Sequence, residues 1–325
     1  MTSPGRGIQL ASESIAGRRP YQEDGVDSTT LDDGRTVVAV ADGMGGHAAG
    51  EVASALALEV VLDALSRGES LDAAVGLANE RVHAVAQDPD KKGMGTTLVV
   101  LLVDGDRYRI ANVGDSRAYL VSADGIEQVT RDHSFVAEAM ASGTPEKEAM
   151  ESPWKDALTR SIGTEPTVEV DVFGPREISD GSALLLCTDG LYKVLSDSDV
   201  KEIFQASGSP GGAAQALVSA ALEGGSDDNI TVAIAEFGEV PRDEPGGTQE
   251  IEWDPPDEIE AGDEGSVGEG RPGAGDEGFS PEADRPGSGA EGAVAAGAAD
   301  RPGFWIPGIL ILLGLVLVVA FLLWM

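Results

Sequence analysis

The chain has 325 residues, 42% of them hydrophobic, and a formal net charge of −35 that arises from 57 acidic residues against 22 lysines and arginines. This acidity argues against a nucleic-acid-binding protein, because such proteins present a basic surface that neutralises phosphates. The single cysteine, Cys187, excludes an internal disulfide bond and fits a reducing compartment.

Residues 1–238 carry the patterns of a folded region that is long enough for one large domain or two small ones. The first residues, Met1 to Ser14, lack the apolar stretch of a secretory signal peptide. Short runs of aliphatic and β-branched residues then predict strands. These runs are 36–41, 97–103, 107–113, 117–121, 183–188 and 230–236.

Asp-Gly pairs at Asp104-Gly105 and Asp124-Gly125 predict hairpin turns, and therefore antiparallel pairing. Stretches rich in alanine and leucine, with apolar residues three and four apart, predict helices at 48–66, 71–87 and 213–223. Continuous apolar strands are typical of sheets buried on both faces, so we expect helices to cover the sheets. The fold class predicted from these elements is α+β, built in layers.

Residues 239–303 are rich in acidic residues, glycine and proline, and their apolar residues show no sustained period. Such a composition cannot bury enough apolar surface to offset the entropy cost of ordering, so we expect a disordered linker. Arg-Pro-Gly recurs at Arg271, Arg285 and Arg301, which we interpret as low-complexity sequence and not as a folded repeat.

Residues 304–325 contain no charged side chain, and Trp305 and Trp324 lie near the two ends of this segment. As a helix the segment is about 33 Å long at about 1.5 Å per residue, enough to cross a hydrocarbon core of about 30 Å. Tryptophan favours the membrane interface. The alternative is a buried core helix, but the preceding tract offers no core. We therefore expect one C-terminal transmembrane helix that anchors the chain in a membrane.

Acidic residues interrupt the folded region where predicted strands begin or end, or lie shortly upstream of them. They are Glu23, Asp24, Asp42, Asp115, Asp189 and Asp228. A buried carboxylate needs an opposing charge, and few lysines or arginines are close in sequence. Oxygen ligands suit Mg²⁺ or Mn²⁺, whereas three histidines and one cysteine are too few and too scattered for a zinc site.

Each motif also has a simpler interpretation. A single Asp-Gly pair is most often a turn. The glycine-rich segment Gly43–Gly46 can be a flexible connector, or it can hold a phosphate at the start of a helix. It lacks the Lys-Ser/Thr of a P-loop and the spacing of a dinucleotide fingerprint. The interpretation as a metal site therefore depends on the whole set of carboxylates.

The set, taken in order, resembles a known family. The motifs are Arg19-x-x-x-Glu23-Asp24, Ala41-Asp42-Gly43-Met44-Gly45-Gly46-His47, Gly93-Met94-Gly95-Thr96-Thr97, Asn112-Val113-Gly114-Asp115-Ser116-Arg117, Thr130-Arg131-Asp132-His133-Ser134, Leu158-Thr159-Arg160-Ser161-Ile162-Gly163, Cys187-Thr188-Asp189-Gly190-Leu191 and Asp228-Asn229-Ile230-Thr231-Val232. They resemble the protein phosphatase 2C family of metal-dependent Ser/Thr phosphatases in its bacterial form. The resemblance runs from about residue 7 to residue 238, and the number of ordered motifs makes it specific.

The resemblance implies a four-layer αββα sandwich of two antiparallel sheets flanked by helices, with two Mn²⁺ or Mg²⁺ ions in a cleft at one end. It implies that Asp42 bridges both ions, that Gly43 offers its carbonyl and that Glu23 supports one ion. It places Asp189 and Asp228 on the other ion. It links Asp115, together with Asp189, to a third and weaker metal.

The same resemblance assigns Arg19 to the substrate phosphate, with the neighbouring Arg18 as the alternative, and gives Asp24 and Asn229 supporting roles. Animal members carry a histidine as candidate general acid where this chain has Met44, so we expect a metal-bound water to protonate the leaving group. His133 is another candidate, although its Asp-His-Ser context is more typical of a structural turn. A polar segment, 135–157, matches the flap of bacterial relatives and predicts two short helices around Gly143.

The predicted function is hydrolysis of phosphoserine and phosphothreonine in proteins. This function implies phosphorylated proteins as substrates and a bacterial Ser/Thr kinase as the opposing enzyme. We expect residues 1–303 to lie in the cytoplasm, and we expect no nucleic-acid partner. Two alternatives remain at this stage. One is a phosphate-binding module without catalysis, and the other is a membrane scaffold that recruits partners through its acidic tract.

Overall fold

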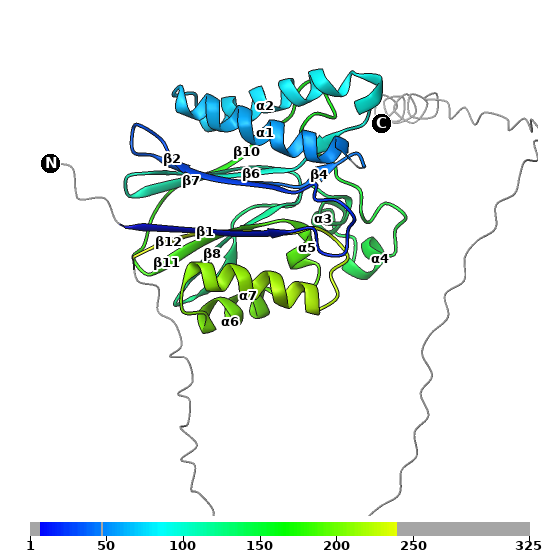
Figure 1. Ribbon diagram of the computed structural model, residues 1–325. Helices are drawn as coiled ribbons and strands as arrows, with labels where there is room; N and C mark the ends of the chain where they lie inside the picture. The colour runs from blue at the N-terminus through cyan, green and yellow to red at the C-terminus, as the bar shows by residue number, and fades with distance from the viewer. Residues whose placement is uncertain (1–6, 47, 239–325) are drawn as a thin grey trace, which may run out of the picture. The chain divides into compact units, whose positions relative to one another are not determined.

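The computed structural model describes residues 7–46 and 48–238. Within this part, two five-stranded antiparallel sheets lie face to face, and helices cover both outer faces (Figure 1). The first sheet has the strand order β1-β12-β11-β8-β9 and the second has the order β10-β7-β6-β3-β2. The predictions of an α+β class and of two antiparallel sheets flanked by helices are therefore confirmed.

The strands of the first sheet are β1 (Ile8–Ile15), β8 (Arg117–Ser122), β9 (Gly125–Gln128), β11 (Ser182–Cys187) and β12 (Ile230–Phe237). Those of the second are β2 (Gly25–Thr30), β3 (Thr36–Ala41), β6 (Leu98–Asp104), β7 (Arg107–Val113) and β10 (Asp171–Glu177). A separate two-stranded ribbon pairs β4 (Gly43–Met44) with β5 (Gly95–Thr96).

Two long helices, α1 (Ala48–Ser66) and α2 (Leu71–Ala86), cover the second sheet, and α6 (Asp197–Ala206) and α7 (Pro210–Glu223) cover the first (Figure 1). The remaining helices are short: the 3-10 turn η1 (Pro89–Lys91), α3 (Phe135–Ala141), α4 (Glu146–Met150) and α5 (Asp189–Tyr192). The pair α3 and α4 confirms the prediction of two short helices around Gly143, and the Ser134 side chain caps the first of them.

The apolar core forms three layers, one between the sheets and one under each helix pair. Strand β3 belongs to two of these layers, because its residues point alternately to the two faces of the sheet. Val37 and Ala39 pack toward α1 and α2, whereas Val38 and Val40 pack between the sheets. A strand buried on both faces reads as a continuous apolar run, which is why it is visible in the sequence.

Several elements lie outside the predicted set. They are β1, β2, β4, β5, β9, β10, η1, α5 and α6. Strand β1 is only partly buried, and its sequence IQLASESI mixes polar with apolar residues. Strand β10 lies at the edge of its sheet and contains Pro175, which weakens the strand signal. Helix α6 begins with a capping box formed by Ser196 and Asp199, a sequence signal that could have revealed it.

No helix in the described part of the chain is long and apolar enough to cross a membrane. The predicted linker, 239–303, and the predicted transmembrane helix, 304–325, both lie outside the described residues.

Strand ends bring the predicted site residues to one end of the sandwich. Strand β3 ends at Ala41, directly before Asp42, and β11 ends two residues before Asp189. Because β11 and β12 are antiparallel, with Cys187 opposite Val232, the residues that follow β11 lie beside those that precede β12. Asp189 and Asp228 are therefore neighbours in the fold.

Candidate metal centre

A cleft of about 610 Å³ opens at this end of the sandwich. Its lining includes every residue that the resemblance assigns to a metal ion or to the substrate phosphate: Arg19, Glu23, Asp42, Gly43, Asp115, Asp189 and Asp228. The lining also contains residues that the sequence analysis did not single out for the site, among them Lys193, Asp156, Thr164 and Glu165.

Asp42 is held through its backbone, which leaves its carboxylate facing the cleft. Its N–H donates to Thr97 Oγ1 at 2.9 Å, and its carbonyl accepts from Thr97 N at 2.9 Å and from Thr96 Oγ1 at 2.8 Å. Among the described residues, none donates a hydrogen bond to the Asp42 carboxylate. Burial first, and then the charges of Asp24 and Asp189, raise the pKa of Asp42 well above its ordinary value. A cation would relieve both effects.

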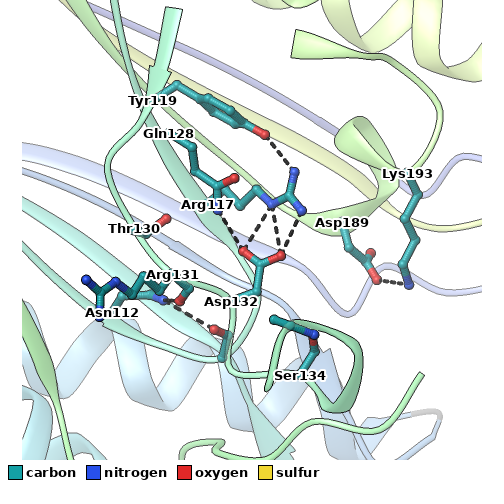
Figure 2. A network of polar contacts seen from close by, with 12 residues as sticks. Asn112, Arg117, Tyr119, Gln128, Thr130, Arg131, Asp132, Ser134, Asp189 and Lys193 are labelled. Atoms are coloured by element: carbon teal, nitrogen blue, oxygen red, sulfur yellow. Dashed lines mark hydrogen bonds and ion pairs between the residues drawn. The ribbon is translucent and has the colours of Figure 1, made fainter. Parts of the chain in front are cut away.

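The two carboxylate oxygens of Asp189 have different surroundings. Oδ2 accepts from Lys193 Nζ at 2.5 Å, one helical turn further along the chain (Figure 2). Oδ1 is buried and has no hydrogen-bond partner among the described residues. A buried carboxylate oxygen without a donor costs free energy, so this atom is available to a metal ion.

Glu23 lies in a tight corner that two glycines create. A Cβ atom on Gly50 would stand 2.5 Å from Glu23 Oε1, and one on Gly43 would stand 2.5 Å from the Glu23 carbonyl oxygen and 2.2 Å from that of Gly50. Only glycine leaves room for such close approach. The position of the Glu23 side chain therefore depends on Gly50, a residue outside the predicted site.

Asp228 is paired with Arg19. Arg19 Nη2 donates to Asp228 Oδ2 at 2.7 Å, and Arg19 Nε donates to the Asp227 carbonyl oxygen at 2.9 Å. The Asp228 side chain is 28% exposed and that of Arg19 is 47% exposed, so the pair lies at the rim of the cleft. Burial and the charge of Asp189 raise the pKa of Asp228, while Asn229 N and Arg19 act in the opposite direction.

Asp24 is buried behind the cleft and does not line it. Its Oδ2 accepts from Thr188 Oγ1 at 2.9 Å and from Thr231 Oγ1 at 2.7 Å. Burial raises the pKa of Asp24 to about 7 despite these hydrogen bonds. Since Thr188 directly precedes Asp189, Asp24 helps to fix the end of β11. This position agrees with the supporting role that the resemblance implies.

Asp115 faces the cleft between a tyrosine and a lysine. Burial, followed by the charge of Asp189, raises the pKa of Asp115 to about 6. The Lys193 charge and a hydrogen bond from Tyr192 act against this rise. The Arg117 guanidinium in turn lies over the Tyr192 ring, with Arg117 Cζ 3.5 Å from the ring centroid.

Arg117 is fixed by a polar network beside the cleft (Figure 2). It donates to Asp132 through Nε at 3.0 Å and through Nη2 at 2.7 Å, and to Tyr119 Oη through Nη1 at 2.9 Å. Gln128 Nε2 also donates to Asp132, at 2.9 Å. This network therefore fixes the ring of Tyr192, and with it the helix that carries Asp189.

His133 does not line the cleft. The Gly114 N–H donates to its Nδ1 at 3.1 Å, and its Nε2 lies 3.4 Å from Asp171 Oδ2. Burial lowers the pKa of His133, so the neutral ring is favoured. The cleft lining includes Met44 and no histidine among the described residues. His133 therefore lies outside the cleft lining, with its ring engaged by Gly114 and Asp171.

The donor set of the cleft suits a hard divalent ion. It consists of carboxylates and a backbone carbonyl, and Asp189 Oδ1 is buried with no hydrogen-bond partner among the described residues. Among these residues, however, no three acidic, cysteine or histidine side chains already enclose a single point. Water molecules can complete the coordination of an ion in such a cleft, as is usual for Mg²⁺.

Comparisons with known proteins agree with this arrangement. The sequence profile of the family Protein phosphatase 2C matches residues 16–223. The serine/threonine phosphatase stp of Listeria innocua is 38% identical over 231 residues, which cover 67% of this chain and 91% of that protein. The sequence signals that extend beyond this match are the acidic tract and the apolar segment near the C-terminus.

Solved structures show the same fold. The S. agalactiae serine/threonine phosphatase has a TM-score of 0.67 at 30% identity and covers 71% of this chain and 100% of that chain. The catalytic domain of the serine/threonine protein phosphatase PstP, in complex with two manganese ions, has a TM-score of 0.60 at 35% identity and covers 71% of this chain and 99% of that one. The paired sheets, the acidic cleft and the matched sequence together show that the chain belongs to the protein phosphatase 2C family.

Proposed function

We propose that this chain hydrolyses phosphoserine and phosphothreonine in proteins with the help of two divalent metal ions. Family membership makes it a protein serine/threonine phosphatase. The observation that carries the metal dependence is the convergence of Glu23, Asp42, Asp189 and Asp228 on one cleft, where Asp189 Oδ1 is buried with no hydrogen-bond partner among the described residues. The manganese ions of the PstP structure support it.

Asp42, Glu23 and the Gly43 carbonyl are the ligands we assign to one ion, and Asp42, Asp189 and Asp228 are those for the other. When bound, such a pair supplies Lewis acidity that activates water near neutral pH. Thr96 and Thr97 hold the backbone of Asp42, so its carboxylate keeps a fixed direction into the cleft. The choice between Mn²⁺ and Mg²⁺ is a matter of supply, because this donor set accepts either ion.

Arg19 is the residue that we assign to the substrate phosphate. It is the arginine in the cleft lining, and its guanidinium stands at the rim, half exposed. A guanidinium can hold two phosphate oxygens at once, which offsets the repulsion between a phosphate and the acidic cleft. Arg19 would then exchange Asp228 Oδ2 for phosphate oxygens, leaving that oxygen to the metal.

The proton for the leaving alkoxide comes, in this proposal, from water in the cleft. Met44 stands where animal members of the family carry a histidine, and it has no proton to give. His133 is buried outside the cleft lining and its ring favours the neutral form. Water is the donor we assign, since the described part of the cleft lining contains no histidine.

We also propose that residues 304–325 anchor the enzyme in a membrane and that 239–303 form the tether, with the catalytic domain in the cytoplasm. The absence of charge in 304–325 and the acidic, Gly- and Pro-rich composition of 239–303 support this. Tethering raises the local concentration of membrane-proximal phosphoproteins, among them substrates of an opposing Ser/Thr kinase. Membrane fractionation and protease protection of the full chain test the topology.

The central test measures hydrolysis of a phosphothreonine peptide by the full chain with and without Mn²⁺. We expect metal-dependent release of phosphate, and a loss of more than about a hundredfold for Asp42→Asn, since even outer partners of metal ligands contribute about 10–100-fold. Lys92→Asn, an exposed change outside the cleft, is the control. Binding of the peptide without turnover in the metal-loaded wild type would instead identify a phosphate-binding module.

A further inference from the structure

Lys193 is the lysine that lines the acidic cleft. It follows the short helix α5, four residues after Asp189, so the helix places both side chains on the same face. Its Nζ lies 2.5 Å from Asp189 Oδ2, and its side chain is 48% exposed, while that of Asp189 is only 11% exposed. The ammonium therefore reaches inward from the rim onto a nearly buried carboxylate (Figure 2).

The ammonium also faces other carboxylates. Asp115 and Asp156 line the same cleft as Lys193 and Asp189. The charge of Lys193 acts on the carboxylates of Asp189 and Asp115. One positive charge thus faces both Asp189 and Asp115, the two residues that the resemblance links to a third metal ion.

The two carboxylate oxygens of Asp189 differ in how open they are to a metal ion. Its Oδ1 has no hydrogen-bond partner among the described residues, but its Oδ2 is taken by Lys193. Asp189 therefore has one open oxygen, which is enough for one metal of a pair. Its second oxygen already faces the Lys193 ammonium, so an ion shared with Asp115 would have to displace that ammonium or bind directly beside it. The Lys193 ammonium would also repel a divalent ion bound beside it, and only the nearby carboxylates would reduce that repulsion.

We propose that the Lys193 ammonium takes the place of a third metal ion between Asp115 and Asp189, so that this chain binds two ions and carries its third cation covalently. This inference rests on the proposed function, since it presupposes the binuclear centre. It differs from the expectation of a third, weaker metal at Asp115. Asp115 is then a positioning residue that holds Lys193 and Tyr192 at the edge of the cleft.

The test is a count of bound Mn²⁺ in the full chain by equilibrium dialysis with elemental analysis, over increasing free Mn²⁺. The comparison uses only differences between variants in the number of bound ions, because the acidic tract at 239–303 is identical in all of them. The variants are Lys193→Asp, Asp115→Asn, the double variant and Asp42→Asn. Lys92→Asp, the same charge change at an exposed lysine outside the cleft, is the matched control.

We expect Asp115→Asn to bind as many ions as the wild type. Lys193→Asp should bind one additional, weaker ion, and the double variant should lose that ion again. Lys92→Asp should bind no additional ion that depends on Asp115. Manganese electron paramagnetic resonance, which detects spin coupling between nearby ions, gives an independent readout of the additional site.

Two results would overturn the inference. One is a wild type that loses an ion on Asp115→Asn, because a third metal would then coexist with Lys193. The other is a folded, metal-loaded Lys193→Asp variant that gains no ion. A wild type whose ion count is unchanged by Asp42→Asn contradicts the binuclear centre itself, so the failure of the proposed function is recognisable separately.

Discussion

Asn229 and Glu23 are 206 positions apart in the sequence, and Asn229 Oδ1 accepts a hydrogen bond from the Glu23 N–H at 2.8 Å. The Asn229 amide also donates to the carbonyl oxygens of Ala16, at 3.0 Å, and Tyr21, at 2.9 Å. One side chain at the start of β12 therefore fixes the loop that carries Arg19 and Glu23. The two halves of the cleft are joined through it.

This relationship predicts the effect of Asn229→Asp. Aspartate retains an acceptor for the Glu23 N–H but loses both amide donors, so the loop carbonyls are left without their partner. We expect a rise in the Mn²⁺ concentration needed for half-maximal activity of about 10–100-fold, as for other outer partners of metal ligands. The loss of stability should be about 1–3 kcal/mol, measured by chemical unfolding. Unchanged metal dependence would refute the positioning role of Asn229.

Arg19 and Arg18 offer a direct comparison, since they are adjacent and only Arg19 lines the cleft. Arg19→Ala should lower kcat/KM for a phosphothreonine peptide by about 10–100-fold, because a hydrogen bond to a charged group contributes about 1.5–3 kcal/mol. Arg18→Ala should leave it nearly unchanged. The reverse result would move the phosphate-binding role to Arg18. Thermal unfolding of both variants checks that neither change acts through stability.

Metal binding should stabilise the fold, because the raised pKa values of Asp42 and Asp228 reflect burial and mutual repulsion that a cation relieves. At a free Mn²⁺ concentration about 100 times the dissociation constant, the gain is about 2.7 kcal/mol. For a domain of this size that corresponds to a rise in Tm of about 5–10 °C. Differential scanning fluorimetry with and without a chelator measures it. Asp42→Asn should show a smaller rise, and an equal rise would contradict the assignment.

His133 predicts a pH dependence of stability. Burial, and then the charge of Arg160, lower the pKa of His133, and its Nδ1 accepts from Gly114 N–H. Since the folded pKa lies below the unfolded value of about 6.5, the unfolded chain binds more protons in this window. Stability is therefore lost as pH falls from about 6.5 through the folded pKa.

The matched variant is His133→Asn, whose amide oxygen can still accept from Gly114 N–H but does not titrate. We expect the wild type to lose more stability than this variant between pH 7 and pH 5, measured by urea unfolding at each pH. Parallel stability curves for the two proteins would show that His133 is not a source of the acid sensitivity.

The sequence predicted those elements whose own pattern is complete. Strand β3 is buried on both faces and reads as an unbroken apolar run, and the turn at Asp104-Gly105 joins β6 to β7 as expected. The elements that the sequence did not predict are stabilised in part by segments that are distant along the chain. Strand β1 is recognisable only through its pairing with β12, with Ile8 opposite Phe237, and a local pattern cannot contain such a partner.

For the site, the ordered motifs of the sequence predict which carboxylates form it, because they identify a family and because strands that end in acidic residues are a local signal. The balance of the carboxylate charges could be seen only in the fold. Lys193 on Asp189, Arg19 on Asp228 and Asn229 on Glu23 are contacts set by the packing of the two sheets and by the turn of α5. The physical reason is that electrostatic interaction depends on distance in space and on burial, and neither quantity is written in the spacing of residues along a chain.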